Sequence, residues 1–400
     1  MNTLEWRAVA GLAVVQALRM LGMFMILPVF ALYARDLPGG VSGLQIGLAL
    51  GAYGLTQALL QVPLGIASDR WGRKPIIVGS LLVFVLGSLI AAATDDIHWI
   101  IAGRLVQGAG ALSAAVSALV ADITRESVRA QAMAVIGVGM GGSFVLALVL
   151  GPMLAAWQGV DGIFALTAAL AALAIPLVIW GVPDAPAIAR GPMRLKAALA
   201  DPTLLRLNAG IFFLSAGMTM LFIAAPLALE TTLQLSLAAH WQVYLPVLAL
   251  SLPPAFWLMR VGEQRQLIAT MMQCAFAALA AALLLAAVSW RQPYELLAAL
   301  LLYFTAFNFL EGVLPAQVSR RAPPAGKGAA LGVYATCQFL GGFMGGVLGG
   351  FALGHFGAPA VFACAAGLPL VWLLIAWGAR GRDDAAAADD YNRPSVLPPP

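Results

Sequence analysis

Long apolar segments alternate with short polar segments along almost the whole chain of 400 residues. A run of about 18 or more mostly apolar residues is long enough to cross a lipid bilayer as an α-helix. Such runs are predicted to form helices over residues 8–33, 44–66, 75–94, 98–121, 131–155, 162–182, 206–230, 239–259, 266–288, 294–317, 328–353 and 358–378. The pattern therefore predicts an all-α, polytopic membrane protein with twelve transmembrane helices.

A polar connection longer than the others separates the sixth predicted helix from the seventh. It covers residues 184–205 and is rich in proline and in basic residues. Internal repeats are common in polytopic membrane proteins, so we expect two pseudo-symmetric six-helix bundles, over residues 1–183 and 206–380, joined by this cytoplasmic linker. Residues 381–400 contain runs of Ala and Asp and end in three prolines, and they are expected to form a disordered cytoplasmic tail.

The composition excludes a soluble protein, because hydrophobic residues make up 62% of the chain and charged residues only 10%, against about 25% charged in soluble domains. Eighteen of the 22 Lys and Arg residues fall in termini or connections that share one side of the membrane. The positive-inside rule places that side in the cytoplasm. We therefore expect an inner-membrane protein with both termini in the cytoplasm. Because this asymmetry explains the basic balance, nucleic acid is not an expected partner.

The chain offers no spacing typical of a catalytic or metal-binding site. The three cysteines, Cys274, Cys337 and Cys364, lie inside apolar segments, where the expected role is that of small buried side chains. The three histidines are scattered near the outer ends of helices, so no Cys/His metal cluster or Ser-His-Asp set can be assembled. We predict a protein that is not an enzyme and needs no metal or cofactor.

A dense cluster of charge lies in the short connection between the second and third predicted helices. Asp69 ends the second helix and Arg73 begins the third, while Asp122 ends the fourth helix on the same side. Carboxylate and guanidinium groups at helix ends can form charge-assisted pairs. We hypothesise a cytoplasmic latch that locks one conformation and opens in another; the alternative is that these charges only set the topology. The predicted latch consists of Gly65, Asp69, Arg70, Gly72, Arg73 and Asp122.

Three charged side chains lie well inside predicted helices, namely Arg19, Arg104 and Glu311. A charge at the centre of a bilayer costs about 3 kcal/mol on insertion scales, so Arg104 is expected to face a cavity. Burial disfavours the charged form of a carboxyl group, which makes Glu311 the leading candidate for a proton carrier. The alternative is a structural ion pair of Glu311 with Arg19 or Arg104. The predicted proton-coupling residues are Glu311, Arg104, Arg19 and Asp122.

A ligand cavity between the helices can be predicted as a class of positions. Methionine and aromatic side chains with a few polar groups suit bulky, amphipathic ligands; the alternative is that these side chains pack in the core or face lipid. The predicted lining consists of Met23, Phe24, Tyr53, Gln57, Gln61, Asn308, Tyr334 and Gln338.

The eleventh predicted helix carries two rows of glycines at four-residue spacing. The rows are Gly341, Gly345 and Gly349, and Gly342, Gly346 and Gly350. Small residues let helix backbones approach closely. Close packing of the helices is a sufficient explanation of these rows; the sharper hypothesis is a moving contact with Gly65 and Gly72 of the charged loop.

Three segments resemble motifs of the major facilitator superfamily. The loop Gly65–Pro75 resembles its signature loop, and the segment Arg104–Ala111 resembles its fourth-helix motif, in which the Arg is linked to proton coupling. The segment Ala147–Ala156 is similar to the motif of the drug/proton antiporters in that superfamily. It contains the expected Gly151 and Pro152, but alanines stand where the motif has further glycines.

Within the superfamily, further segments resemble the YajR-type efflux transporters. These segments cover residues 18–25, 53–57, 122–126, 308–315 and 332–341. The resemblance implies an inner-membrane transporter with twelve helices that is driven by protons, and it leaves the substrate open. With the predicted cavity lining, we expect a secondary active transporter that exports small apolar or amphipathic compounds in exchange for protons by alternating access. A proton gradient then supplies the energy, and we expect a monomer in the lipid bilayer. The alternative is a proton-linked importer of sugars or other nutrients.

Overall fold

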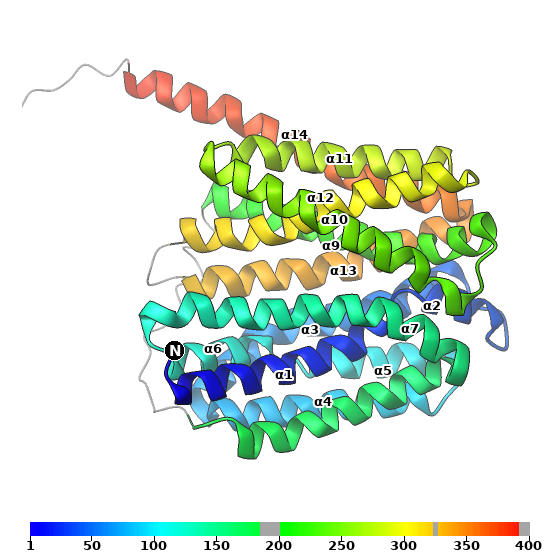
Figure 1. The fold of residues 1–400 in the computed structure, drawn as a ribbon, viewed down its shortest axis with the longest axis horizontal. Helices are drawn as coiled ribbons and strands as arrows, with labels where there is room; N and C mark the ends of the chain where they lie inside the picture. Colours follow the sequence, from blue (N-terminus) through cyan, green and yellow to red (C-terminus); the bar gives the residue numbers. More distant parts are fainter. Residues whose placement is uncertain (185–200, 323–326, 392–400) are drawn as a thin grey trace, which may run out of the picture.

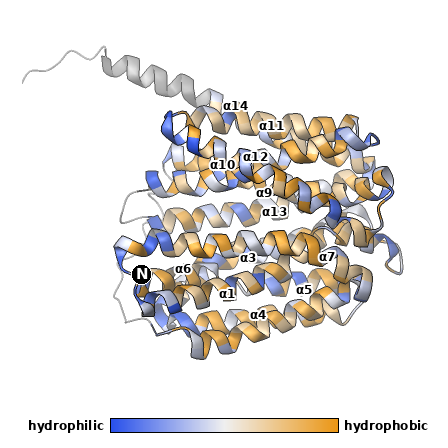
Figure 2. Cartoon of the chain, in the orientation of Figure 1, coloured by the Kyte–Doolittle hydropathy of each residue, from blue (hydrophilic) through white to orange (hydrophobic). Residues whose placement is uncertain are grey.

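The computed structural model describes residues 1–184, 201–322 and 327–391. Within these ranges every regular element is helical, and eleven helices are long and apolar enough to cross a membrane. Figure 1 shows the long helices lying side by side as one bundle. Figure 2 shows apolar residues along the lengths of the helices and polar residues gathered at the two ends of the bundle. We call the end that holds the N-terminus the inner side, following the predicted orientation.

The N-terminal half contains five long helical segments and several short ones. Pro28 lacks a backbone N–H, which explains why the first helix breaks before it resumes as a short turn. The fourth predicted helix is likewise divided, at residues 110–112. The elements are α1 (Thr3–Met25), α2 (Phe30–Tyr33), η1 (Ala34–Asp36), α3 (Gly43–Trp71), α4 (Arg73–Ala92), α5 (Ile97–Ala109), α6 (Ser113–Ile123), α7 (Glu126–Pro176) and η2 (Leu177–Gly181).

Helix α7 covers both the fifth and the sixth predicted helices. Gly159 interrupts it with a positive φ of 71°, a backbone conformation that glycine adopts without steric cost. Figure 1 shows the chain reversing its direction within α7, at the outer end of the bundle, and returning along the bundle. The two legs of α7 thus lie on either side of the connection predicted between residues 155 and 162. The count of twelve transmembrane helices and the pseudo-symmetry stay predictions.

The C-terminal half begins at Pro202, where Asp201 caps the helix by accepting hydrogen bonds from the backbone N–H groups of Thr203 and Leu204. Proline is favoured in this first turn because its missing N–H would have no helical partner. The elements are α9 (Pro202–Leu233), η3 (Leu237–Ala239), α10 (Trp241–Gln264), α11 (Ile268–Val288), α12 (Pro293–Arg321), α13 (Lys327–Phe356) and α14 (Ala358–Tyr391).

The linker and tail predictions are only partly within the described residues. Most of the predicted linker, residues 185–200, lies outside them, and its last four residues belong to α9. The prediction of a disordered tail from residue 381 is wrong for residues 381–391, because α14 continues as a helix to Tyr391. The run of alanines explains this, since Ala has the strongest helix propensity. Residues 392–400 lie outside the described part.

Exposed tryptophans mark both ends of the bundle. Trp71 and Trp180 lie near the inner ends of their helices, and Trp99 and Trp157 lie near the outer ends. All four side chains are more than half exposed. Tryptophan concentrates where a membrane meets water, because its ring is amphipathic. These positions fit helices that span a bilayer from one side to the other.

The hydrophobic core has two separate parts. One core contains most of the buried apolar residues of the C-terminal half together with outer residues of the N-terminal half, such as Phe30, Leu50 and Phe164. The other contains inner residues of the N-terminal half, such as Leu12 and Leu119, and Phe339 is the partly buried residue of the C-terminal half that packs against it. Among the described residues, the two halves therefore share their apolar core on the outer side and have separate cores on the inner side.

Candidate functional site

The charged cluster predicted at the inner ends of the second, third and fourth helices is confirmed as a set of contacts. The Arg73 guanidinium donates from Nε to Asp122 Oδ2 over 3.0 Å and from Nη1 to Ser68 Oγ over 2.5 Å. It also forms an ion pair with Asp69. The side chains of Arg73 and Asp122 are largely buried, whereas Asp69 is 41% exposed. The role of this cluster as a latch stays a prediction.

Two glycines shape the backbone around this cluster. Gly72 adopts a φ of 94° between α3 and α4, which lets one helix end and the next begin within a single residue. A Cβ on Gly65 would lie 3.3 Å from Ala114 Cβ, so glycine allows α3 to lie close to α6. Arg70 is exposed, and no described residue forms an ion pair with it. Within the predicted latch, Arg73 thus makes the central contacts and Arg70 lies apart from them.

A second cluster is polar and lies in the middle of the N-terminal half. Arg19 is 1% exposed and donates hydrogen bonds to Tyr53 Oη over 2.6 Å and to Ser113 Oγ over 3.0 Å. The Tyr53 hydroxyl donates to Gln57 over 2.9 Å, and Gln57 donates to Gln61 over 3.2 Å. Hydroxyl and amide groups therefore bind the two terminal nitrogens of the buried cation, Nη1 and Nη2, and no described carboxylate pairs with it.

The expectation that Arg104 faces a cavity is wrong for this structure. Its side chain is 3% exposed and donates to the backbone carbonyls of Ala49 over 3.1 Å and Leu50 over 3.4 Å, and to Gln107 Oε1 over 2.9 Å. Its guanidinium also lies 5.2 Å from the centre of the Tyr53 ring, a cation–π distance. Arg104 therefore fastens α5 to the backbone of α3.

The C-terminal half holds a third cluster, which contains the only acidic side chain predicted well inside a helix. Gln338 on α13 donates to Glu311 Oε1 on α12 over 3.0 Å. One turn away, Asn308 donates to Ser251 on α10 over 2.9 Å. In the described part of the chain no ion pair joins Glu311 to Arg19 or Arg104, so the alternative of a structural ion pair finds no support. Glu311 has an amide as its partner rather than a cation.

The residues predicted to line a ligand cavity divide between these clusters and the core. Tyr53, Gln57 and Gln61 belong to the Arg19 cluster, and Asn308 and Gln338 belong to the Glu311 cluster. Tyr334 is buried, and Met23 packs against the inner core of the N-terminal half. Phe24 packs edge-on against Phe144 at a centroid distance of 5.1 Å. Their role in lining a cavity stays a prediction.

One aromatic contact brings the two central clusters near each other across the halves. The Tyr53 ring, which accepts from Arg19 through its hydroxyl, meets the Phe339 ring edge-on at a centroid distance of 6.2 Å. Phe339 directly follows Gln338 in α13. A movement of α13 around Gln338 would therefore reach the Arg19 cluster through the contact of Phe339 with Tyr53.

Gly151 and Pro152 lie inside α7, where the chain passes the end of α1. A Cβ on Gly151 would lie 2.5 Å from the carbonyl oxygen of Met25, so only glycine allows this approach. Pro152 removes one backbone donor from the helix. The motif therefore places α7 directly against the end of α1.

The glycines of α13 have different neighbours from those expected. Gly346 and Gly350 lie against Gly47 and Gly43 of α3, and a Cβ on Gly43 would lie 2.6 Å from the carbonyl oxygen of Gly350. The other row, exemplified by Gly341, lies against the backbone of α9. The expectation of contact with Gly65 and Gly72 is wrong here, because α13 meets the outer part of α3. The four-residue spacing of Gly43, Gly47 and Gly51 was a signal that our sequence interpretation missed.

A helical membrane protein with charged and amide side chains enclosed in both halves has the architecture of a secondary transporter. The family model of the Major Facilitator Superfamily matches residues 12–346, so the chain belongs to this superfamily. The inner membrane transport protein YajR of Escherichia coli strain K12 is 42% identical over 382 residues, which cover 93% of this chain and 83% of that protein. The chain is therefore similar to an inner membrane transport protein over most of both lengths.

Two further similarities complete the comparison. The class C tetracycline resistance protein of Escherichia coli is 31% identical over 207 residues, or 50% of this chain and 51% of that protein. The crystal structure of a bacterial homolog of the human lysosomal transporter Spinster, in an inward-facing and occupied conformation, has a TM-score of 0.77 at 14% identity. It covers 95% of this chain and 97% of the solved one. This last similarity shows the fold.

Proposed function

We propose that this protein is a proton-coupled antiporter that exports small apolar or amphipathic compounds by alternating access. The observation that carries the proposal is Glu311, an acidic side chain inside a membrane helix that has Gln338 as its hydrogen-bond partner and no cation beside it among the described residues. Intramembrane carboxyl groups commonly mark proton relays. A carboxyl group without a cation can become neutral by taking up a proton, whereas a salt-bridged one resists protonation.

In this proposal Glu311 takes up a proton while the site is open to the outside and releases it while the site is open to the cytoplasm. The neutral and charged forms of Glu311 interact differently with Gln338 and with a bound compound. Protonation therefore changes the relative stability of the outward-open and inward-open conformations. Release of the compound outside accompanies uptake of the proton. The proton gradient then supplies the energy, and no cofactor is needed.

The direction of transport rests on two observations. Gly151 and Pro152 hold α7 against the end of α1 in the way described above, and the segment around them resembles the antiporter motif. The chain is also similar over half its length to a tetracycline resistance protein, which places drug-like compounds among the candidate substrates. We further propose that the protein acts as a monomer in the inner membrane with both termini in the cytoplasm.

Inside-out vesicles that contain the protein test the class of substrate. A proton gradient is imposed with the lumen acidic, and a pH dye reports proton release while lipophilic cations, neutral drugs and sugars are added separately. The proposal expects release of protons on addition of an amphipathic cation or neutral drug, above that of vesicles without the protein. Movement of protons into the lumen on addition of sugars alone would instead favour an importer of nutrients.

The charged cluster gives a separate prediction. Asp69→Asn removes the exposed partner of Arg73 but keeps Asp122, so the variant should fold and should transport more slowly. Because exposed ion pairs contribute at most about 1 kcal/mol, we expect a loss of up to about fivefold in the transport rate. Size-exclusion chromatography in detergent checks the fold. Unchanged transport by Asp69→Asn would reduce the cluster to a determinant of topology.

A further inference from the structure

We propose that Arg35 and Glu230 form an outer lock that holds the two halves together while the inner side is open. Arg35 Nη2 lies 2.5 Å from Glu230 Oε2. Arg35 belongs to η1 in the N-terminal half, and Glu230 belongs to the last turn of α9 in the C-terminal half. The two residues are separated by 195 positions in the sequence, so the ion pair reports directly on the distance between the halves.

This ion pair connects the two halves of the protein. It joins residue 35 of the N-terminal half to residue 230 of the C-terminal half on the outer side. The remaining ion pairs between described residues each lie within one half; examples are those of Arg125 with Glu5 and Arg320 with Glu263. The outer side also holds the shared apolar core and the close glycine contacts between α3 and α13.

The short segment that carries Arg35 is fastened to its own half. The Tyr33 hydroxyl lies 3.3 Å from Asp161 Oδ1 on α7 and 3.4 Å from Asp95 Oδ1 before α5. Arg35 therefore moves with the N-terminal half, and a rotation of the halves on the outer side must break its contact with Glu230.

The C-terminal end of α9, which carries Glu230, favours a cation close to that carboxylate. The carbonyl groups at the C-terminal end of a helix carry a partial negative charge, so the Glu230 carboxylate is disfavoured in the last turn of α9 unless a cation offsets it. Arg35 is the nearest such cation. It is also one of only two basic residues predicted on the outer side, which gives this exception to the positive-inside rule a specific role.

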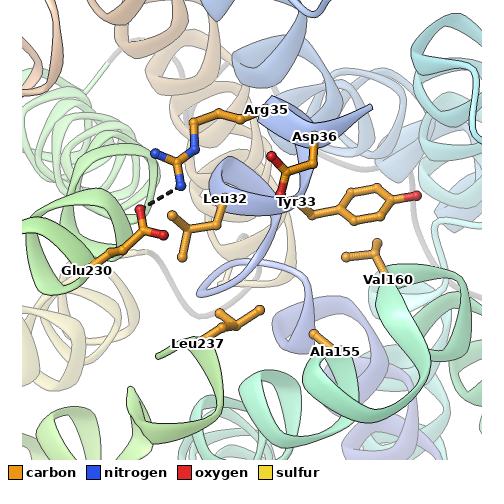
Figure 3. A pocket seen from close by; sticks show the side chains of 8 residues that line it. All are labelled: Leu32, Tyr33, Arg35, Asp36, Ala155, Val160, Glu230 and Leu237. Carbon is orange, nitrogen blue, oxygen red and sulfur yellow. Dashed lines mark hydrogen bonds and ion pairs between the residues drawn. The ribbon is translucent and has the colours of Figure 1, made fainter. Parts of the chain in front are cut away.

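A cavity beside the ion pair shows that the halves meet here without filling the space. Figure 3 shows Arg35 and Glu230 joined at one edge of this cavity, with Tyr33 and Val160 on another side. The cavity has a volume of about 200 Å³, and its lining comes from both halves. Apolar packing between the halves is incomplete at this cavity. The ion pair therefore contributes a larger share of the free energy that holds the halves together there. The cavity would widen when the ion pair separates.

The inference rests on the proposed alternating access, and a distance measurement without substrate tests it. Spin labels are placed on Ala93→Cys at the outer end of α4 and Val288→Cys at the outer end of α11, after the three native cysteines are replaced by serine. Both positions are exposed. Glu230→Gln and Arg35→Gln should each increase the population with the longer distance by up to about fivefold, the size expected for an exposed ion pair.

Two matched variants decide the outcome. The double variant Arg35→Glu with Glu230→Arg restores opposite charges and should return the distances to those of the parent protein. Glu263→Gln removes an ion pair of equal length, 2.5 Å, with side chains of similar exposure, but both partners lie in the C-terminal half; it should change nothing. The proposal is overturned if the single variants leave the distances unchanged or if Glu263→Gln shifts them equally. Because no gradient or substrate is used, this failure would be separate from failure of proton coupling at Glu311.

Discussion

Replacing Glu311 with Gln should reduce substrate-dependent proton flux to the level of vesicles without the protein. Gln has nearly the same shape as Glu and keeps an oxygen that can accept the hydrogen bond from Gln338. The fold should therefore survive while the group that exchanges a proton is lost. The measurement is the dye assay in inside-out vesicles, with equal amounts of protein verified by immunoblot.

A carboxyl group elsewhere provides the control for this variant. Glu263 lies at the inner end of α10, where it pairs with Arg320, and its side chain is 52% exposed. Glu263→Gln should keep more than half of the proton flux, because this residue lies outside the membrane-embedded clusters. Equal flux in the Glu311→Gln variant and the parent protein would remove Glu311 from the proton path. The search for the carrier would then move to Asp69 and Asp122.

Replacing Gly47 with Leu should slow transport by about 5- to 150-fold. A side chain at this position meets the backbone of Gly346 on α13, so the outer parts of α3 and α13 can no longer approach. Overpacking of a close contact costs about 1–3 kcal/mol, which corresponds to that range at room temperature. The conformation closed on the outside becomes less populated, and the cycle stalls. The transport rate and the spin-label distances between α4 and α11 measure the effect.

The matched control is Gly79→Leu. Gly79 lies on α4, and a Cβ there would meet nothing within 4 Å. Its replacement adds the same side chain to a membrane helix without touching a neighbour, so transport should stay within about twofold of the parent protein, as for other substitutions away from contacts. If Gly79→Leu slowed transport as much as Gly47→Leu, the loss would stem from the added side chain itself. The contact between α3 and α13 would then carry no special role.

The sequence predicted the helices and the charged cluster because both depend on simple regularities. Long apolar runs must form helices in a membrane, since no water is present to satisfy the backbone. Asp69, Arg73 and Asp122 each lie at the inner end of a helix, so the alternation of direction between successive helices brings them to one surface. Their ion pairs in the structure follow from that topology.

The contacts of the buried arginines could not be predicted in the same way. Arg104 binds backbone carbonyls of Ala49 and Leu50, which exist at every residue and therefore leave no signal in the sequence. Arg19 binds hydroxyl and amide groups from two helices, α3 and α6, rather than the carboxylate that the alternative of an ion pair with Glu311 required. These partners depend on how the helices rotate about their axes, and hydrophobic patterns fix that rotation weakly in a membrane because lipid and core are both apolar.

The contact between Arg35 and Glu230 depends on the arrangement of the two halves. The sequence alone indicates only that each residue is a charge at the outer end of a helix, and neither residue lies in a motif. Their pairing exists only when the halves are closed on the outer side. A sequence describes all conformations of a transporter at once, whereas this contact belongs to one of them.

The direction of coupled movement tests the central proposal most directly. A radiolabelled compound that triggers proton release is added to inside-out vesicles whose lumen is acidic, and its amount inside is followed with and without a protonophore. An antiporter exchanges lumenal protons for the compound, so we predict accumulation in the lumen that the protonophore abolishes and that Glu311→Gln lacks. A symporter would carry protons and compound out together. Exclusion of the compound from the acidic lumen would therefore contradict the account.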